Sequence, residues 1–134
     1  MNGVTADANI YVSALQFGGV PRQFLNTARQ GLIRLDISDA LLGEVIRVLR
    51  EKFLWSEPML QREIRQLSRF TVRVHPTQII DAVPDDPDDN KVLECAVAAG
   101  SRYIVSGDNA LLRLGQYAGI PIVRVADFMR RLTP

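Results

Sequence analysis

The chain contains very little of the chemistry that builds disulfides and transition-metal sites. Its 134 residues include one cysteine, Cys95, and one histidine, His75. A single cysteine excludes an internal disulfide and fits the reducing environment of the cytoplasm. Zinc and copper sites normally use several histidine or cysteine ligands, so both metals are disfavoured. His75 has no acid or nucleophile beside it and precedes a proline, which indicates a surface or capping residue.

Long uncharged apolar runs are also missing. No window approaches roughly 18 such residues, and the first residues lack a basic region followed by an apolar run, so we expect neither a membrane span nor a signal peptide. The formal net charge is only +1, which does not by itself indicate a nucleic-acid partner. Only two of the 16 basic residues are lysines; the arginine excess suits phosphate contacts, but genome composition produces the same bias. Length and a hydrophobic content of 47% predict one globular domain spanning residues 1–134.

The chain does carry a dense group of acids. Four of its fifteen acidic residues fall within residues 85–89, directly before a helical apolar repeat. A helix N-cap and first turn use about two carboxylates, so four exceed the need for capping. The repeat ends at Gly100, and residues 102–106 predict a short buried strand leading to Asp108. A helix between two strands returns the chain to the same edge of a parallel sheet, so Asp108 is expected at the carboxyl end of a strand.

The rest of the chain alternates between strand and helix patterns. Further strands are predicted at residues 3–7, 32–37, 70–75 and 120–125, and further helices at 10–15, 21–29, 41–49, 59–67, 110–114 and 126–132. This alternation predicts an α/β fold with a largely parallel sheet.

Glu44 lies at the margin of the apolar arc of its predicted helix. At about 100° per residue, it is roughly 60° from Leu41 and 100° from Val45, so it points neither into the core nor fully away from it. This position suits a carboxylate at the rim of a pocket. The same spacing also allows a solvated ion pair with Arg47.

A predicted helical hairpin carries apolar residues near its tip. Phe53, Trp55, Met59 and Leu60 are candidates for a surface that contacts a partner protein or the second subunit of a homodimer. The alternative is that they complete the core.

The acids point to a cation. Asp7 and Asp108 each follow a predicted parallel strand, and Asp86, Asp88 and Asp89 begin a helix between two such strands. Carboxylates within about 4–6 Å of one another repel and raise one another's pKa, so such a cluster requires a cation. An oxygen-only ligand set favours Mg²⁺ or Mn²⁺, which can activate water and neutralise charge on a phosphoryl group during phosphodiester hydrolysis.

Three known acidic motifs do not fit. An EF-hand starting at Asp86 needs glycine where Lys91 stands and glutamate where Val97 stands. A haloacid-dehalogenase-like phosphatase needs an aspartate at the position of Asn9. A response-regulator receiver domain needs a lysine at the end of a late strand, where this chain has none.

Several segments together resemble the PIN-domain nucleases. Residues 4–10 are similar to the Asp-x-Asn opening of that family. Glu44, in the helix predicted after the second strand, resembles the acid that the family has in that helix. Residues 84–96 and 103–112, with Asp-Pro-Asp-Asp followed by a strand that ends in Ser-Gly-Asp, resemble its third and fourth acidic segments. The resemblance covers nearly the whole chain and is closest to the VapC-like toxins of toxin–antitoxin pairs. Ala8 departs from the frequent threonine or serine, which weakens a supporting hydrogen bond but removes no ligand.

The resemblance implies a three-layer α/β/α sandwich with a central, mostly parallel sheet. It further implies Mg²⁺ or Mn²⁺, hydrolysis of single-stranded RNA by metal-activated water, and inhibition by a cognate antitoxin. Carried over to this sequence, the catalytic and metal-binding acids are Asp7, Glu44, Asp89 and Asp108, with Asn9 and Ser106 as supporting residues. Asp86 and Asp88 have no firm counterpart and are either auxiliary ligands or helix caps. The alternatives are a catalytically silent scaffold of the same fold, against which the intact acids argue, and a DNA flap nuclease.

Overall fold

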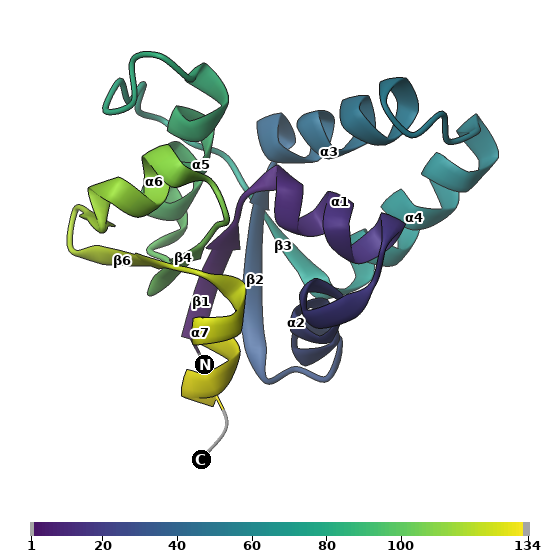
Figure 1. Ribbon diagram of the computed structural model, residues 1–134, viewed down its shortest axis with the longest axis horizontal. Helices are drawn as coiled ribbons and strands as arrows, with labels where there is room; N and C mark the ends of the chain where they lie inside the picture. Colours follow the sequence, from purple (N-terminus) through teal and green to yellow (C-terminus); the bar gives the residue numbers. More distant parts are fainter. Residues whose placement is uncertain (1, 133–134) are drawn as a thin grey trace.

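A sheet in the order β3-β2-β1-β4-β6-β5 runs through the middle of the computed structural model, which describes residues 2–132 (Figure 1). The strands are β1 (Asn2–Ala6), β2 (Ile33–Ser38), β3 (Thr71–Val74), β4 (Tyr103–Val105), β5 (Gln116–Tyr117) and β6 (Ile120–Val123). Neighbouring strands are parallel except for β5 and β6, which form an antiparallel pair.

Helices cover both faces of this sheet. They are α1 (Ala8–Gln16), α2 (Gly19–Arg29), α3 (Asp39–Glu51), α4 (Glu57–Phe70), α5 (Pro87–Ala99), α6 (Asn109–Leu114) and α7 (Val125–Leu132). Helices α1 to α4 lie on one side and α5 and α6 on the other, while α7 packs against α2 (Figure 1). The predicted α/β/α sandwich with a mostly parallel sheet is therefore confirmed.

The boundaries of several elements differ from those predicted. Phe70 is the last residue of α4 rather than the first residue of a strand. Strand β5 was not predicted, because two residues are too short to show an alternating pattern. The last helix begins at Val125, one residue earlier than predicted, and Asp127 in its first turn pairs with Arg130.

The apolar residues near the α3–α4 hairpin do not form one exposed surface. Leu60 is 1% exposed, so of the two alternatives for this residue the core is correct and the partner surface is wrong. Phe53 and Trp55 are half-buried; the Trp55 indole N–H donates to Gln16 Oε1 at 2.7 Å, and the Phe53 ring packs edge-on against Phe17. These contacts join the hairpin to the end of α1.

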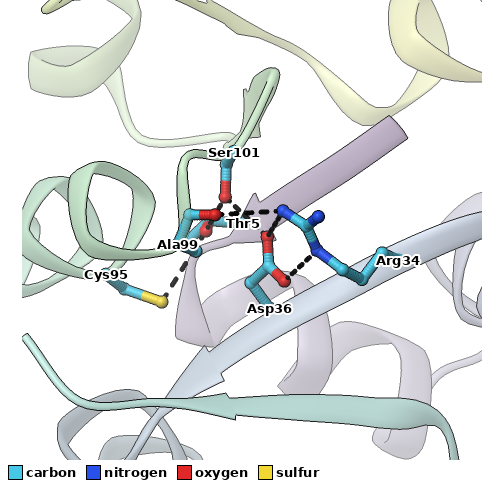
Figure 2. Close-up of polar contacts among 6 residues, drawn as sticks. All are labelled: Thr5, Arg34, Asp36, Cys95, Ala99 and Ser101. Atoms are coloured by element: carbon cyan, nitrogen blue, oxygen red, sulfur yellow. Dashed lines mark hydrogen bonds and ion pairs between the residues drawn. The ribbon is translucent and has the colours of Figure 1, made fainter. Parts of the chain in front are cut away.

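A buried carboxylate lies in the centre of the sheet. Asp36 of β2 is 1% exposed and accepts two hydrogen bonds from Arg34, at 2.8 and 3.2 Å, and one from Ser101 Oγ at 2.8 Å (Figure 2). Arg34 Nη2 also donates to the Ala99 carbonyl at 3.1 Å, at the C-terminal end of α5. The guanidinium therefore compensates both the carboxylate and the negative end of a helix dipole.

Gly3 makes room for this ion pair. It lies opposite Arg34 in the register of β1 and β2, and a Cβ on residue 3 would come within 2.0 Å of Arg34 Nη2. Any side chain here would displace the guanidinium from its partners. Beside Gly3, the Thr5 hydroxyl lies 2.8 Å from Ser101 Oγ and 3.6 Å from Cys95 Sγ (Figure 2). Burial raises the pKa of the Cys95 thiol to about 11, so it is protonated at neutral pH.

Candidate metal centre and active site

The site begins where β1 and β4 end side by side. Ala6 pairs with Val105, and the Asp7 backbone N–H extends the ladder by donating to the Val105 carbonyl at 3.0 Å. The chain connects β1 to β2 and β3 in one direction along the sheet and then crosses to β4 and β6 in the other. Open α/β sheets bind ligands at such a reversal, at the carboxyl ends of the strands.

Ser106 connects the two aspartates that follow these strands. Its hydroxyl donates to Asp7 Oδ2, and its oxygen accepts the Asp108 backbone N–H at 2.9 Å. Asp7 also caps α1 by accepting the Ile10 N–H at 3.1 Å. Burial raises the pKa of Asp7, and the hydrogen bonds from Ser106 and Ile10 act in the opposite direction. Ser106 therefore fixes the orientation of Asp7.

Three carboxylates converge beside this pair. One oxygen each of Asp86, Asp89 and Asp108 lies within 4.8 Å of the other two. Asp86 caps α5 and Asp108 caps α6, so two helix N-termini hold these side chains in place. Burial and the adjacent Asp108 raise the pKa of Asp89 to about 8, whereas the hydrogen bond with Asp89 lowers the pKa of Asp108.

Asp89 has an oxygen with no partner. Its Oδ2 is buried and accepts no hydrogen bond within residues 2–132. A buried polar atom without a partner costs free energy, and such atoms are rare in native proteins. A cation among the three carboxylates would satisfy this atom and remove the repulsion. The oxygen-only donor set fits a hard divalent ion.

A cavity of about 100 Å³ opens over the cluster. The acids that line it are Asp7, Glu44, Asp86, Asp88, Asp89 and Asp108. Asn9 lies at its rim, and the side chain of Asp88 is exposed.

Glu44 is placed at the rim of this cavity, and it is also paired. Arg47 Nε and Nη2 donate to its two oxygens at 3.1 and 2.5 Å, so the pocket position and the ion pair are both present. The structure thus brings Asp86, Asp89 and Asp108 together, with Asp7 held by Ser106 and Glu44 held by Arg47.

The acidic segment is held in place by two buried polar residues, Asn90 and Glu94, that were not predicted from the sequence. Asn90 exchanges hydrogen bonds with the backbone N–H and carbonyl of Val83, at 2.8 and 2.7 Å, and Glu94 accepts the Ile80 N–H at 3.1 Å. They lie one turn apart on α5 and fasten the connection from β3. The signal was present as polar residues at i and i+4 on an otherwise apolar face.

The fold and the cluster define an α/β/α protein with three carboxylates at the ends of its parallel strands, a donor set that could hold a metal ion. A family model described as "PIN domain" matches residues 4–110, well over half of the chain. The chain therefore belongs to the PIN-domain family, whose members are generally metal-dependent nucleases, and the predicted resemblance is confirmed at that level. No curated protein matches the sequence significantly. None of the described helices is long and apolar enough to cross a membrane.

Without a bound cation, the protein is expected to lose stability as the pH rises from about 4 to about 8. The folded-state pKa of Asp89 lies above that of an unfolded aspartate, so over this range the folded state retains a proton that the unfolded state releases. The stabilising contribution of this proton is complete below the unfolded-state pKa of about 4 and is lost above the folded-state pKa of about 8. Urea unfolding in EDTA at several pH values measures it.

Two variants identify the group responsible. Asp89→Asn should remove most of the slope, with a remainder from Asp7, whose pKa is also raised. Asp85→Asn should keep the wild-type slope, because Asp85 is exposed and outside the cluster. Saturating Mg²⁺ should flatten the wild-type profile, since a cation displaces the proton. A full slope in Asp89→Asn would assign the titration to another group.

Proposed function

We propose that the protein is a Mg²⁺- or Mn²⁺-dependent endoribonuclease that hydrolyses phosphodiester bonds of single-stranded RNA, with residues 1–134 as one nuclease domain. The observation that carries the proposal is the convergence of Asp86, Asp89 and Asp108 around an unpartnered buried oxygen, in a chain of the PIN-domain family. A divalent ion held there supplies a water of lowered pKa and neutralises the phosphoryl charge.

Each acid then has a role set by its surroundings. Asp89 and Asp108 would hold the cation with Asp86, and Asp89 gives up its proton on binding because its pKa is about 8 in the free protein. Asp7 would complete the acidic set in the orientation that Ser106 fixes. Glu44 would join it directly or through water after exchanging its partner Arg47.

The remaining site residues fit water attack rather than a covalent intermediate. The Ser106 hydroxyl is 0% exposed and already donates to Asp7, so it is a positioning residue and not a nucleophile. Asn9 is exposed at the rim of the cavity, where its amide can contact a substrate phosphate or sugar.

We also propose a biological setting from the motif resemblance described above. The protein would act in the cytoplasm as the toxin of a toxin–antitoxin pair, controlled by a cognate antitoxin protein, and a homodimer is one candidate assembly. What supports this is the Asp-Pro-Asp-Asp segment followed by a strand ending in Ser-Gly-Asp.

The test is metal-dependent cleavage of a defined RNA. Purified protein, stripped with EDTA and reloaded with Mg²⁺ or Mn²⁺, is incubated with single-stranded RNA, the same sequence as DNA, and a flap DNA. We expect cleavage of the RNA alone and only with metal. Cleavage of flap DNA in preference would make the protein a DNA nuclease. RNA binding without any cleavage would make it a silent scaffold.

A further inference from the structure

A cleft of about 480 Å³ lies between α1, α2 and α4, separate from the acidic cavity, and three arginines line it: Arg22, Arg29 and Arg62. We propose that this cleft binds backbone phosphates of the same single-stranded RNA whose scissile bond lies at the acidic site. The proposal rests on the proposed function and adds a second contact region for the substrate.

The three guanidiniums are available to an anion. Arg62 makes no hydrogen bond or ion pair within residues 2–132. Arg22 uses only its Nε, which donates to the Ala14 carbonyl at 3.3 Å, so its two terminal nitrogens stay free. The Arg29 guanidinium carbon lies over the Phe70 ring, 4.6 Å from its centroid, and the group makes no hydrogen bond or ion pair within residues 2–132.

The charge of the cleft is strongly one-sided. Glu63 is the one acid among the lining residues, against three arginines, and no ion pair joins it to them within the described chain. Two arginines of α3, by contrast, are paired with acids: Arg47 with Glu44 and Arg50 with Glu57. Like charges gathered in one hollow repel until an anion enters, and a planar guanidinium matches a phosphate through two hydrogen bonds.

The lining favours a phosphate backbone over bases. None of the described residues that line the cleft is aromatic, and the nearby Phe70 ring is covered by Arg29, so these residues offer no platform for base stacking. Contacts to phosphates position a strand without reading its sequence. Binding at this cleft is therefore expected to be independent of sequence and sensitive to salt.

Helix α1 extends from the acidic cavity to the arginine cleft. Asp7 caps its start in the acidic site, whereas Ala14 and Leu15 near its other end line the arginine cleft. At 1.5 Å per residue, Asp7 and Ala14 are separated by about 10 Å along the helix axis. A strand that extends a few nucleotides beyond the scissile bond can reach both sites.

The experiment measures RNA affinity by fluorescence anisotropy in an Asp108→Asn background, so that RNA is not cut. The cleft variant carries Arg22→Gln, Arg29→Gln and Arg62→Gln, and the matched control carries Arg65→Gln, an exposed arginine of α4 outside the cleft. For a long oligouridylate, the cleft variant should bind about tenfold more weakly, and its slope of log K against log[salt] should fall by about 2, since each single-strand phosphate contact contributes about 0.7. A dinucleotide, which is too short to extend from the acidic site into the cleft, should bind all three proteins equally.

Further outcomes separate this inference from the proposed function. If long RNA binds the cleft variant and the Arg65→Gln control with equal affinity and salt slope, the RNA-binding role of the cleft is wrong, whereas the proposed nuclease function still stands. If the background protein binds no RNA of either length, both the role of the cleft and the proposed nuclease function are wrong. Polyglutamate that displaces long RNA from the background but not from the cleft variant would reassign the cleft to an acidic protein. Arg62→Gln alone, which breaks no internal contact, should lower the slope by about 0.7 with an unchanged melting temperature, and no change would count against the assignment.

Discussion

Replacing Asp108 by asparagine is expected to lower the rate of metal-dependent RNA hydrolysis at least about a hundredfold, because a lost carboxylate ligand removes several kcal/mol of stabilisation from the transition state. Asparagine retains an oxygen that can accept the Leu111 N–H and cap α6, and the backbone N–H that bonds Ser106 is untouched. The fold should therefore survive. Single-turnover cleavage with saturating Mg²⁺ measures the effect.

Asp85→Asn is the matched control for this variant. Asp85 precedes the cluster by one residue and is exposed, so its loss should leave the rate within about twofold, as for other surface substitutions. In EDTA above about pH 8, where Asp89 is also ionised, Asp108→Asn should unfold at a higher temperature than wild type, since it removes one of three crowded charges, and Mg²⁺ should shrink or reverse that difference. Normal cleavage by Asp108→Asn would place the cation elsewhere. A lower melting temperature that ignores Mg²⁺ would make Asp108 a structural cap only.

Arg34→Met is expected to be the most destabilising single change in the buried network of Figure 2, costing about 3 kcal/mol of the free energy of unfolding. Asp36 would keep its charge in the centre of the sheet with only Ser101 as a donor, and the Ala99 carbonyl would lose its partner. The value lies at the lower end for broken buried pairs because Arg34 is itself 37% exposed. Equilibrium urea unfolding gives the number.

A second substitution distinguishes a lost ion pair from lost packing. Adding Asp36→Asn to Arg34→Met removes the uncompensated charge and should recover most of the stability. A cost below about 1 kcal/mol for Arg34→Met would mean that the pair behaves like an ordinary surface ion pair.

The sequence predicted the architecture well because each element carries its own pattern. The alternation of short apolar strands with amphipathic helices identified the parallel sheet, and the positions of Asp7 and Asp108 after β1 and β4 followed from strand ends alone. The acids before α5 exceeded what helix capping needs. Strand β5 escaped detection because its two residues are defined by pairing with β6 and not by a pattern of their own.

The sequence could not determine which acidic oxygens meet. Residues 86, 89 and 108 come together through the fold of the connection before α5, which Asn90 and Glu94 fasten by contacts to distant backbone groups. Glu44 could be placed at a pocket rim or beside Arg47, and only side-chain geometry shows that both hold.

The role of Asp36 was hidden for a similar reason. No motif in the sequence identifies Asp36 as a buried carboxylate, and its compensation depends in part on Ser101, a residue 65 positions further along the chain. Contacts of that kind leave no periodic signal in the sequence.

The guanidinium that crosses β1 also constrains how this sequence can vary over evolution. A chain that acquires a side chain at Gly3 has no room for Arg34, and a chain without Arg34 keeps a buried Asp36 with too few partners. Each of these substitutions alone lowers the stability of the fold, so no single substitution removes the network without loss of stability. Among descendants of a common ancestor, Gly3, Arg34 and Asp36 should therefore be inherited or replaced as one unit, even though none of them lines the acidic cavity.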